Sequence, residues 1–223
     1  MIPKVVEINS RKIGQRFSPY VVAELSGNHD GSLEKALKTM VEAKKAGADA
    51  LKIQTYRADS ITIDHDGPDF ILEDGLWKGR KLYELYSQAA TPWDWHETIF
   101  EKGKELNLTV FSSPFDRDAV EFLDSFDVPA YKIASPEIID LPLIEVVASR
   151  GKPLVISTGM ASEVEIEEAV STAQHAGASD IILLHCISAY PTQPKDSNLL
   201  VLPDLSKKLA LPVGLSDHTI DIT

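Results

Sequence analysis

Residues 212–219 read PVGLSDHT, and this stretch decides the fold. A short apolar run ends there directly in the polar residues Ser216, Asp217 and His218. Six earlier segments have the same form, with runs that begin near residues 20, 49, 108, 130, 153 and 180. Because parallel strands buried on both faces are continuous apolar runs, the sequence predicts seven parallel strands. Each would present polar side chains at its carboxyl end, where the active sites of (β/α)8 barrels lie.

The segments between these runs carry the signals of helices. Five of the six intervals are roughly 20–30 residues long, about the length of one strand–helix unit. Ser32, Asp116 and Asp140 each precede an amphipathic segment at the N-cap position. Ser162 and Glu165 have the spacing of a capping box. Alternating strands and helices with polar strand ends predict an α/β protein with the (β/α)8 TIM barrel fold.

Three features modify this barrel. A hairpin is expected before it, at residues 5–14, with a turn at Asn9 and Ser10. The one long interval carries an insertion at about residues 57–90, followed by a helix for which Thr91 would be the cap and Pro92 the first residue. Only seven strands are found, so the eighth strand–helix unit is missing. We therefore expect residues 1–223 to be one truncated barrel domain of a longer protein, because an open sheet exposes unpaired backbone groups.

The composition argues against several classes of function. The chain has 223 residues and a formal net charge of −12, whereas nucleic-acid binding depends on Lys and Arg side chains that neutralise phosphates. No apolar stretch reaches the roughly 20 residues of a membrane-spanning helix, and no signal peptide is visible. The single cysteine, Cys186, fits a reducing compartment. We therefore expect a cytoplasmic protein without a nucleic-acid or membrane partner.

The polar strand ends, taken in order, resemble the sialic acid synthase family. The similar segments are ELSGNHDG (24–31), KIQTY (52–56), FSSPFD (111–116), YKIAS (131–135), STGM (157–160), LHC (184–186) with YP (190–191), and GLSDHT (214–219). The resemblance runs from about residue 20 to residue 219, which is far more specific than any single motif. Residues 26–27, 74–79 (DGLWKG) and 91–96 (TPWDWH) are most similar to the pseudaminic acid synthase branch.

This resemblance implies an enzyme that condenses phosphoenolpyruvate with an amino sugar. In the pseudaminic acid branch, the sugar is a 2,4-diacetamido-2,4,6-trideoxy hexose of the altrose type. Water is the third reactant, and the products are a nine-carbon nonulosonic acid and phosphate. Complete family members continue into an eighth strand and a small antifreeze-like domain, which reaches into the partner's active site in a homodimer. Synthesis of N-acetylneuraminate or legionaminic acid is the alternative within the family.

The resemblance also implies a set of residues that bind phosphoenolpyruvate. They are Lys52, Gln54, Ser113, Lys132, Ser135, Ser157, Ser188, Tyr190 and Ser216. Two ammonium groups and several hydroxyls suit a ligand with a phosphate and a carboxylate. Both lysines interrupt apolar runs, where burying an unpaired charge is costly, although a paired or snorkelling lysine is the structural alternative. Many family members carry Asn at the position of Ser188.

Glu24 and His218 match the catalytic residues of the family. Glu24 would transfer protons that involve the attacking water or the sugar hydroxyls; its structural alternative is an ion-paired or helix-capping glutamate. His218 matches one of two histidines that hold a divalent metal, expected to be Mn²⁺ or Mg²⁺, which polarises the sugar aldehyde for attack by C3 of phosphoenolpyruvate. The second histidine of the family would lie beyond Thr223. We therefore expect half of the metal site in this chain.

Two functions of other classes stay open at this point. Lysines on barrel strands can act as amine nucleophiles, so Lys52 or Lys132 could serve a Schiff-base aldolase. Borohydride trapping would detect that chemistry, whereas phosphate release and a metal requirement favour the synthase. A fragment that binds a sugar without turnover is the other alternative, because the second histidine is missing.

Overall fold

A computed structural model describes residues 3–75 and 77–220 of the chain. Leu76, which belongs to the DGLWKG segment, and the chain end at Thr223 lie outside the described residues. The chain divides into two compact units. One unit is Tyr20–Val128, and the other combines Met1–Pro19 with Pro129–Thr223.

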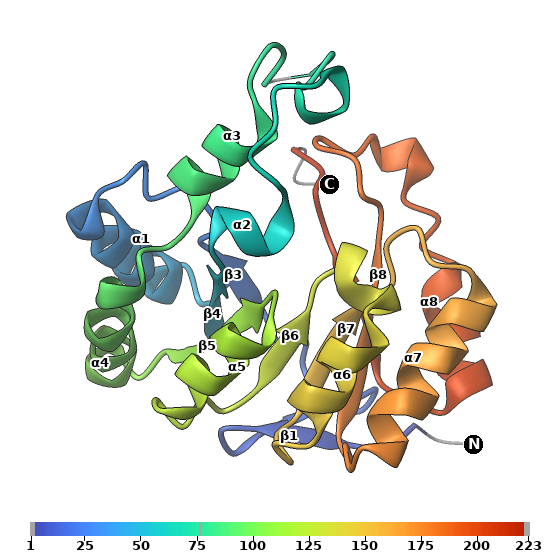
Figure 1. The fold of residues 1–223 in the computed structure, drawn as a ribbon. Coiled ribbons are helices and arrows are strands. Elements are labelled where there is room, and N and C mark those ends of the chain that lie inside the picture. The colour runs from blue at the N-terminus through green and yellow to red at the C-terminus, as the bar shows by residue number, and fades with distance from the viewer. Residues whose placement is uncertain (1–2, 76, 221–223) are drawn as a thin grey trace. The chain divides into compact units, whose positions relative to one another are not determined.

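The unit Tyr20–Val128 contains three parallel strands in the order β3-β4-β5 (Figure 1). The strands are β3 (Val22–Glu24), β4 (Ala50–Thr55) and β5 (Thr109–Pro114). The helices are α1 (Leu33–Lys45), α2 (Ala58–Ile61), η1 (Pro68–Phe70), α3 (Leu82–Ala89), η2 (Trp93–Trp95), α4 (His96–Leu106) and α5 (Arg117–Asp124). Helices α1 and α4 pack against each other and against β4 and β5, respectively. The segment expected as an insertion holds α2, η1 and α3.

The predicted N-caps of this unit are confirmed in two places and wrong in one. The side chains of Ser32 and Asp116 accept hydrogen bonds from the backbone N–H groups of Lys35 and Ala119. Thr91, in contrast, does not cap a helix: it is buried, and Pro92 takes the N-cap position. The physical reason is the ψ angle of Pro92, 134°, which is not helical, so that the first helical residue is Trp93.

The second unit contains the predicted hairpin and four parallel strands in the order β6-β7-β8-β9. The strands are β1 (Val6–Ile8), β2 (Arg11–Ile13), β6 (Tyr131–Ile133), β7 (Leu154–Ser157), β8 (Ile181–Cys186) and β9 (Val213–Ser216). The helices are η3 (Pro136–Ile139), α6 (Leu141–Ala148), α7 (Glu163–His175), η4 (Pro194–Asp196) and α8 (Val201–Leu209). In this unit α6 packs on α7, and α8 packs on β9 (Figure 1).

Local chemistry explains the turns and helix starts of the second unit. Asn9 and Ser10 both have positive φ angles, 48° and 66°, as a tight two-residue hairpin turn requires. Ser162 accepts a hydrogen bond from the Glu165 N–H, and the Glu165 carboxylate accepts one from the Ser162 N–H at 2.7 Å. Asp140 caps α6 through the Leu143 N–H. The hairpin, the capping box and the Asp140 cap are therefore confirmed.

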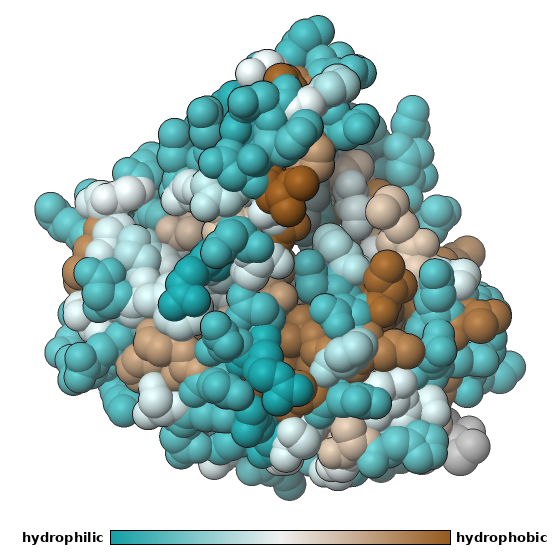
Figure 2. Space-filling model, in the orientation of Figure 1, coloured by the Kyte–Doolittle hydropathy of each residue, from teal (hydrophilic) through white to brown (hydrophobic). Residues whose placement is uncertain are grey.

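Strands β4 to β8 bury apolar side chains on both faces, as the sequence pattern predicts, whereas the residues of β3 and β9 are half-buried or exposed, so the prediction is wrong for these two strands. All residues of β6 and β7 are buried, and so are five of the six residues of β8. Most of the surface in the view of Figure 2 is hydrophilic, with hydrophobic residues gathered near the centre of the view. Within residues 3–75 and 77–220, no helix combines the length and the apolar character needed to cross a membrane.

Candidate active site

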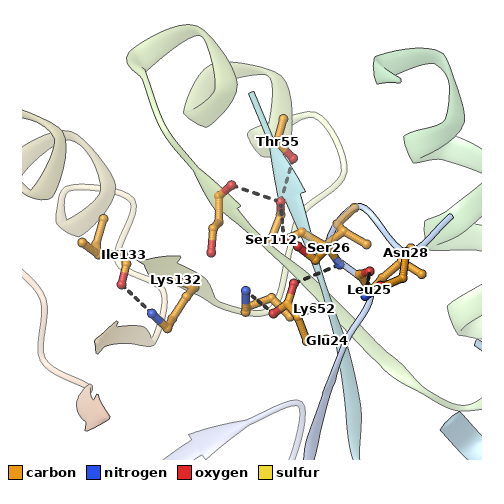
Figure 3. Close-up of polar contacts among 11 residues, drawn as sticks. Glu24, Leu25, Ser26, Asn28, Lys52, Thr55, Ser112, Lys132 and Ile133 are labelled. Atoms are coloured by element: carbon orange, nitrogen blue, oxygen red, sulfur yellow. Dashed lines mark hydrogen bonds and ion pairs between the residues drawn. The ribbon is translucent and has the colours of Figure 1, made fainter. Parts of the chain in front are cut away.

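Glu24, at the end of β3, and Lys52, within β4, form an ion pair between two neighbouring strands. The register of β3 and β4 places the two residues opposite each other, and the Lys52 ammonium contacts the Glu24 carboxylate (Figure 3). Glu24 Oε1 also accepts a hydrogen bond from the Ser26 N–H at 3.1 Å. The Lys52 side chain is 14% exposed and the Glu24 side chain 40%. The structure therefore brings together a predicted substrate-binding cation and a predicted proton-transfer group, in the ion-paired form that was the structural alternative for Glu24.

Gln54 and Ser113 form the next cross-strand pair, between β4 and β5. Ser113 is fully buried, and its Oγ has no hydrogen-bond partner in the part of the chain that the structure describes. Nearly all buried polar atoms in folded proteins are hydrogen-bonded, so an exception calls for a partner from outside the chain. The Ser113 hydroxyl therefore marks a place where a polar ligand or a water molecule would bind.

A buried hydrogen-bond network lies beside this pair, at the ends of the same two strands. Thr55 Oγ1 lies 2.8 Å from His96 Nε2 and 2.6 Å from Ser112 Oγ, while His96 Nδ1 lies 3.2 Å from the Pro92 carbonyl oxygen. Burial lowers the pKa of His96 to about 4 despite the hydrogen bonds to backbone carbonyls. His96 is therefore neutral: its Nδ1–H donates a hydrogen bond to the Pro92 carbonyl oxygen, and its Nε2 accepts a hydrogen bond from the Thr55 hydroxyl. This network ties α4 to β4 and β5.

Lys132 is the most deeply buried of the predicted cations. It lies on β6, is 4% exposed, and donates a hydrogen bond to the Ile133 carbonyl oxygen at 2.6 Å (Figure 3). The nearby Glu137 has its pKa raised by burial, and the charge of Lys132 opposes that shift only in part. An ammonium group in such a place is costly unless charged or polar groups surround it. Its position at the end of a parallel strand fits an anion-binding role.

Ser135 and Ser188 converge on the backbone of Gly159. A Cβ atom added at Gly159 would lie 2.5 Å from Ser135 Cβ, 2.9 Å from Ser135 Oγ and 3.2 Å from Ser188 Oγ. Gly159 itself has a φ of 49°, in the left-handed region. Two predicted substrate-binding hydroxyls from separate loops therefore lie close together because residue 159 has no side chain. Ser157, two residues earlier, ends β7 and is 2% exposed.

Cys186 lies among the predicted site residues at the end of β8. The register of β8 and β9 places it opposite Ser216. Burial raises the pKa of the Cys186 thiol, but hydrogen bonding with His218, Ser135 and Ser216 outweighs this effect and lowers the pKa to about 7. Cys186 is thus buried, as a core residue would be, and is also in contact with three of the predicted site residues.

His218 lies directly after β9 with a defined orientation. Its Nδ1 donates a hydrogen bond to the Ile187 carbonyl oxygen at 2.9 Å, and its ring lies 4.2 Å from the Tyr190 ring, centroid to centroid. Hydrogen bonding with Cys186 raises the pKa of His218. A carbonyl bound at Nδ1 leaves Nε2 as the lone-pair nitrogen of the neutral ring, which is the arrangement of metal-binding histidines.

His218 therefore fits the role of one metal ligand, but the described residues do not complete a site. No group of three or more His, Cys, Asp or Glu side chains within residues 3–75 and 77–220 is arranged to hold a metal ion.

A surface groove between α6 and α7, lined in part by Glu145, Glu168 and His175, is separate from the candidate site. Its residues lie on helices, whereas every predicted site residue lies on or just after a parallel strand.

Comparison with known proteins identifies the family. A model described as the NeuB family matches residues 39–223. The chain belongs to the NeuB family.

Two pseudaminic acid synthases are among the similar curated proteins. The synthase of Campylobacter jejuni subsp. jejuni serotype O:23/36 (strain 81-176) is 49% identical over 200 residues, which cover 90% of this NeuB-family chain and 58% of that protein. The synthase of Helicobacter pylori (strain ATCC 700392 / 26695) is 44% identical over 202 residues, 91% of this chain and 59% of that protein. This NeuB-family chain thus spans less than two thirds of the length of these relatives. The predicted resemblance to sialic acid synthases, closest to the pseudaminic branch, is confirmed.

Solved structures confirm the fold class. The N-acetylneuraminic acid synthetase of Leptospira borgpetersenii serovar Hardjo-bovis, in complex with citrate, superimposes with a TM-score of 0.87 at 30% identity. The match covers 99% of this NeuB-family chain and 72% of that chain. The spore coat polysaccharide biosynthesis protein spsE of Bacillus subtilis gives a TM-score of 0.81 at 30% identity, over 97% of this chain and 57% of that chain. The seven predicted parallel strands are all present.

Sequence reasoning missed several residues of this NeuB-family site. Cys186 was not predicted as a site residue, although its place beside Ser216 follows from the strand register. Gly159 was part of a quoted motif without a role of its own. The sequence does contain a signal for the network of Thr55 and Ser112. Successive residues of a strand point to opposite faces, so Ser112 and Ser113 cannot both point to the same face.

Proposed function

We propose that this chain forms the barrel portion of a pseudaminic acid synthase. The reaction joins phosphoenolpyruvate, a 2,4-diacetamido-2,4,6-trideoxy hexose of the altrose type and water, and it yields pseudaminic acid and phosphate. Identities of 44% and 49% to two pseudaminic acid synthases support this choice of product. The single structural observation that carries the proposal is the buried, unpartnered Ser113 hydroxyl, one strand away from Lys52. This hydroxyl would donate a hydrogen bond to an anionic ligand at the ends of the parallel strands.

Phosphoenolpyruvate provides the groups that these side chains would bind. Its phosphate and carboxylate are anionic, and Lys52 and Lys132 supply two cations with little exposure to solvent. Hydroxyl groups donate hydrogen bonds to anionic oxygens without adding charge, a role that Ser113, Ser135 and Ser157 would share. Because the chain as a whole carries a formal charge of −12, these local cations would determine where the anion binds.

Glu24 would move a proton in this reaction. Its carboxylate contacts the Lys52 ammonium and accepts a hydrogen bond from the Ser26 N–H, and these two contacts fix its direction. An oriented carboxylate can accept a proton from the attacking water or from a sugar hydroxyl. The carbon–carbon bond forms between C3 of phosphoenolpyruvate and the sugar aldehyde carbon, water adds, and phosphate leaves.

His218 would supply one ligand of a divalent metal, with the remaining ligands provided outside the described residues or by the substrate. Such a metal, when bound, would polarise the aldehyde oxygen of the sugar. The side chain itself is already oriented for this role, because the Ile187 carbonyl fixes its Nδ1 and the Tyr190 ring packs beside it. We also propose that the complete enzyme is a cytoplasmic homodimer, as the family resemblance implies.

Phosphate release tests the proposed function. The complete enzyme, supplied with phosphoenolpyruvate and Mn²⁺, should release phosphate with the altrose-type acetamido sugar and much more slowly with the acceptors of the legionaminic and N-acetylneuraminic acid pathways. The alternative product is worth testing because an N,N'-diacetyllegionaminic acid synthase of Legionella pneumophila is 32% identical over 213 residues. A preference for another sugar would mean that the product is not pseudaminic acid, while the condensation with phosphoenolpyruvate would still stand. Borohydride trapping of Lys52 or Lys132 with a carbonyl substrate, without phosphate release, would reject the synthase in favour of an aldolase.

A further inference from the structure

The loop after β7 brings a glycine into unusually close contact with two site hydroxyls. The gap between a hypothetical Gly159 Cβ and Ser135 Cβ, 2.5 Å, is far below ordinary van der Waals contact. Ser135 Cβ is one bond from the backbone and cannot swing away as the end of a long side chain would. Pro136 follows Ser135 and begins η3, which restricts the backbone at this point further. Residue 159 therefore controls where Ser135 can lie.

We propose that Gly159 is a positioning residue of the phosphoenolpyruvate site. Its missing side chain allows the hydroxyls of Ser135 and Ser188, which come from the loops after β6 and β8, to approach the same segment of backbone. Any side chain at position 159 would displace Ser135 more than Ser188. The Cβ atom would lie 3.2 Å from Ser188 Oγ, and rotation of the Ser188 side chain can relieve that contact. This inference rests on the proposed function, since it assigns a geometry to two of the predicted substrate-binding serines.

The chain offers matched controls for the glycine itself. Gly151 and Gly177 have positive φ angles of 67° and 107°, yet a Cβ at either position would meet no atom within 4 Å. Alanine at these positions therefore strains the backbone in the same left-handed region without touching any site residue. A fall in stability common to all three alanine variants would report backbone strain, and an effect on substrate binding confined to position 159 would report displacement of the serines.

The experiment measures phosphoenolpyruvate binding by calorimetry on the complete enzyme and its Gly159→Ala, Gly151→Ala and Gly177→Ala variants. We expect Gly159→Ala to weaken binding at least ~10-fold, the effect of losing one charge-assisted hydrogen bond, and to raise the KM for phosphoenolpyruvate more than the KM for the sugar. The two control variants should keep the wild-type Kd. Equal Kd values for Gly159→Ala and wild type would overturn the inference while leaving the proposed function standing.

A double-mutant cycle keeps the inference testable if Gly159→Ala folds poorly. Ser135→Gly removes the atom that the new Cβ would strike, so adding Gly159→Ala to Ser135→Gly should cost little further affinity for phosphoenolpyruvate. If adding Gly159→Ala to Ser135→Gly weakens binding by a further ~10-fold, Gly159 does not act through Ser135 and the inference is wrong. A wild-type enzyme that does not bind phosphoenolpyruvate at all would instead reject the proposed function, and this inference with it.

Discussion

At the scale of single residues, the charge on Lys132 is expected to determine the affinity for phosphoenolpyruvate. Lys132→Met keeps the apolar stem but removes the ammonium from a position that is 4% exposed. A hydrogen bond to a charged group contributes about 1.5–3 kcal/mol, so the Kd should rise at least ~10-fold. Calorimetry on the complete enzyme checks this, with Lys12→Met on the exposed face of β2 as the control. An unchanged Kd would remove Lys132 from the site.

Glu24 should matter for turnover more than for binding. Glu24→Gln keeps the shape and the contact with the Ser26 N–H but cannot accept a proton, so kcat should fall by at least ~100-fold. The exposed Glu34, in the first turn of α1, provides the control variant Glu34→Gln. Steady-state phosphate release measures turnover, and circular dichroism measures folding, so together they separate a catalytic role of Glu24 from a structural one. If Glu24→Gln keeps near-normal turnover, or loses its fold, then Glu24 serves the structure through its ion pair with Lys52.

His96 should make the stability depend on pH in a window set by its lowered pKa. The folded protein keeps His96 neutral down to a pKa of about 4, whereas the unfolded chain takes up the proton below the ordinary value of 6.5. Stability should therefore fall as the pH drops from 6.5 towards 4, by roughly 2 kcal/mol between pH 6.5 and 5. Urea unfolding at pH 6.5 and at pH 5 measures this difference in the free energy of unfolding. His96→Gln should abolish this part of the pH dependence, and an unaltered slope would show that other groups cause it.

At the scale of elements, helix α7 depends on its capping box. Ser162→Ala removes the side-chain acceptor of the Glu165 N–H and should cost about 1 kcal/mol, or a fall in Tm of roughly 2–4 °C. Glu165→Gln is the matched variant, because Gln can still accept a hydrogen bond from the Ser162 N–H. Calorimetric melting should therefore show a smaller loss for Glu165→Gln. Equal losses would mean that the negative charge of Glu165 near the helix start contributes as much to the stability of α7 as the Ser162 hydrogen bond.

The elements also show what the sequence could predict and why. Helix starts at Ser32, Asp116 and Asp140 follow from hydrogen bonds over three residues, so a local pattern is enough. The helix start predicted at Thr91 was wrong, because a proline can precede a helix or open it, and only the ψ angle of Pro92 shows that it precedes η2. The contacts of Cys186 and Gly159 join segments that are distant in the chain, and no local pattern encodes them.

At the scale of the whole molecule, the candidate residues are distributed over both units of the chain. Glu24 and Lys52 belong to Tyr20–Val128, while Lys132 and His218 belong to the other unit. In the proposed reaction, Lys52 and Lys132 would bind the anion, whereas aldehyde activation would depend on a metal held in part by His218, so metal removal should separate the two. In the complete enzyme, a chelator should stop phosphate release while phosphoenolpyruvate still binds within a few-fold of its original Kd. Loss of binding and turnover together would mean that the metal holds phosphoenolpyruvate itself.

The pairing of site residues across neighbouring strands has a consequence for how such enzymes can diverge. Glu24 faces Lys52, Gln54 faces Ser113, and these neighbours are fixed by one hydrogen-bonding register. Deleting or inserting a single residue within β4 would turn its side chains to the opposite faces of the strand and lose both partnerships at once. The segment between β4 and β5, with its short helices, carries no such constraint. Changes of acceptor sugar during evolution should therefore have come through gains and losses of loop residues, with strand lengths held constant.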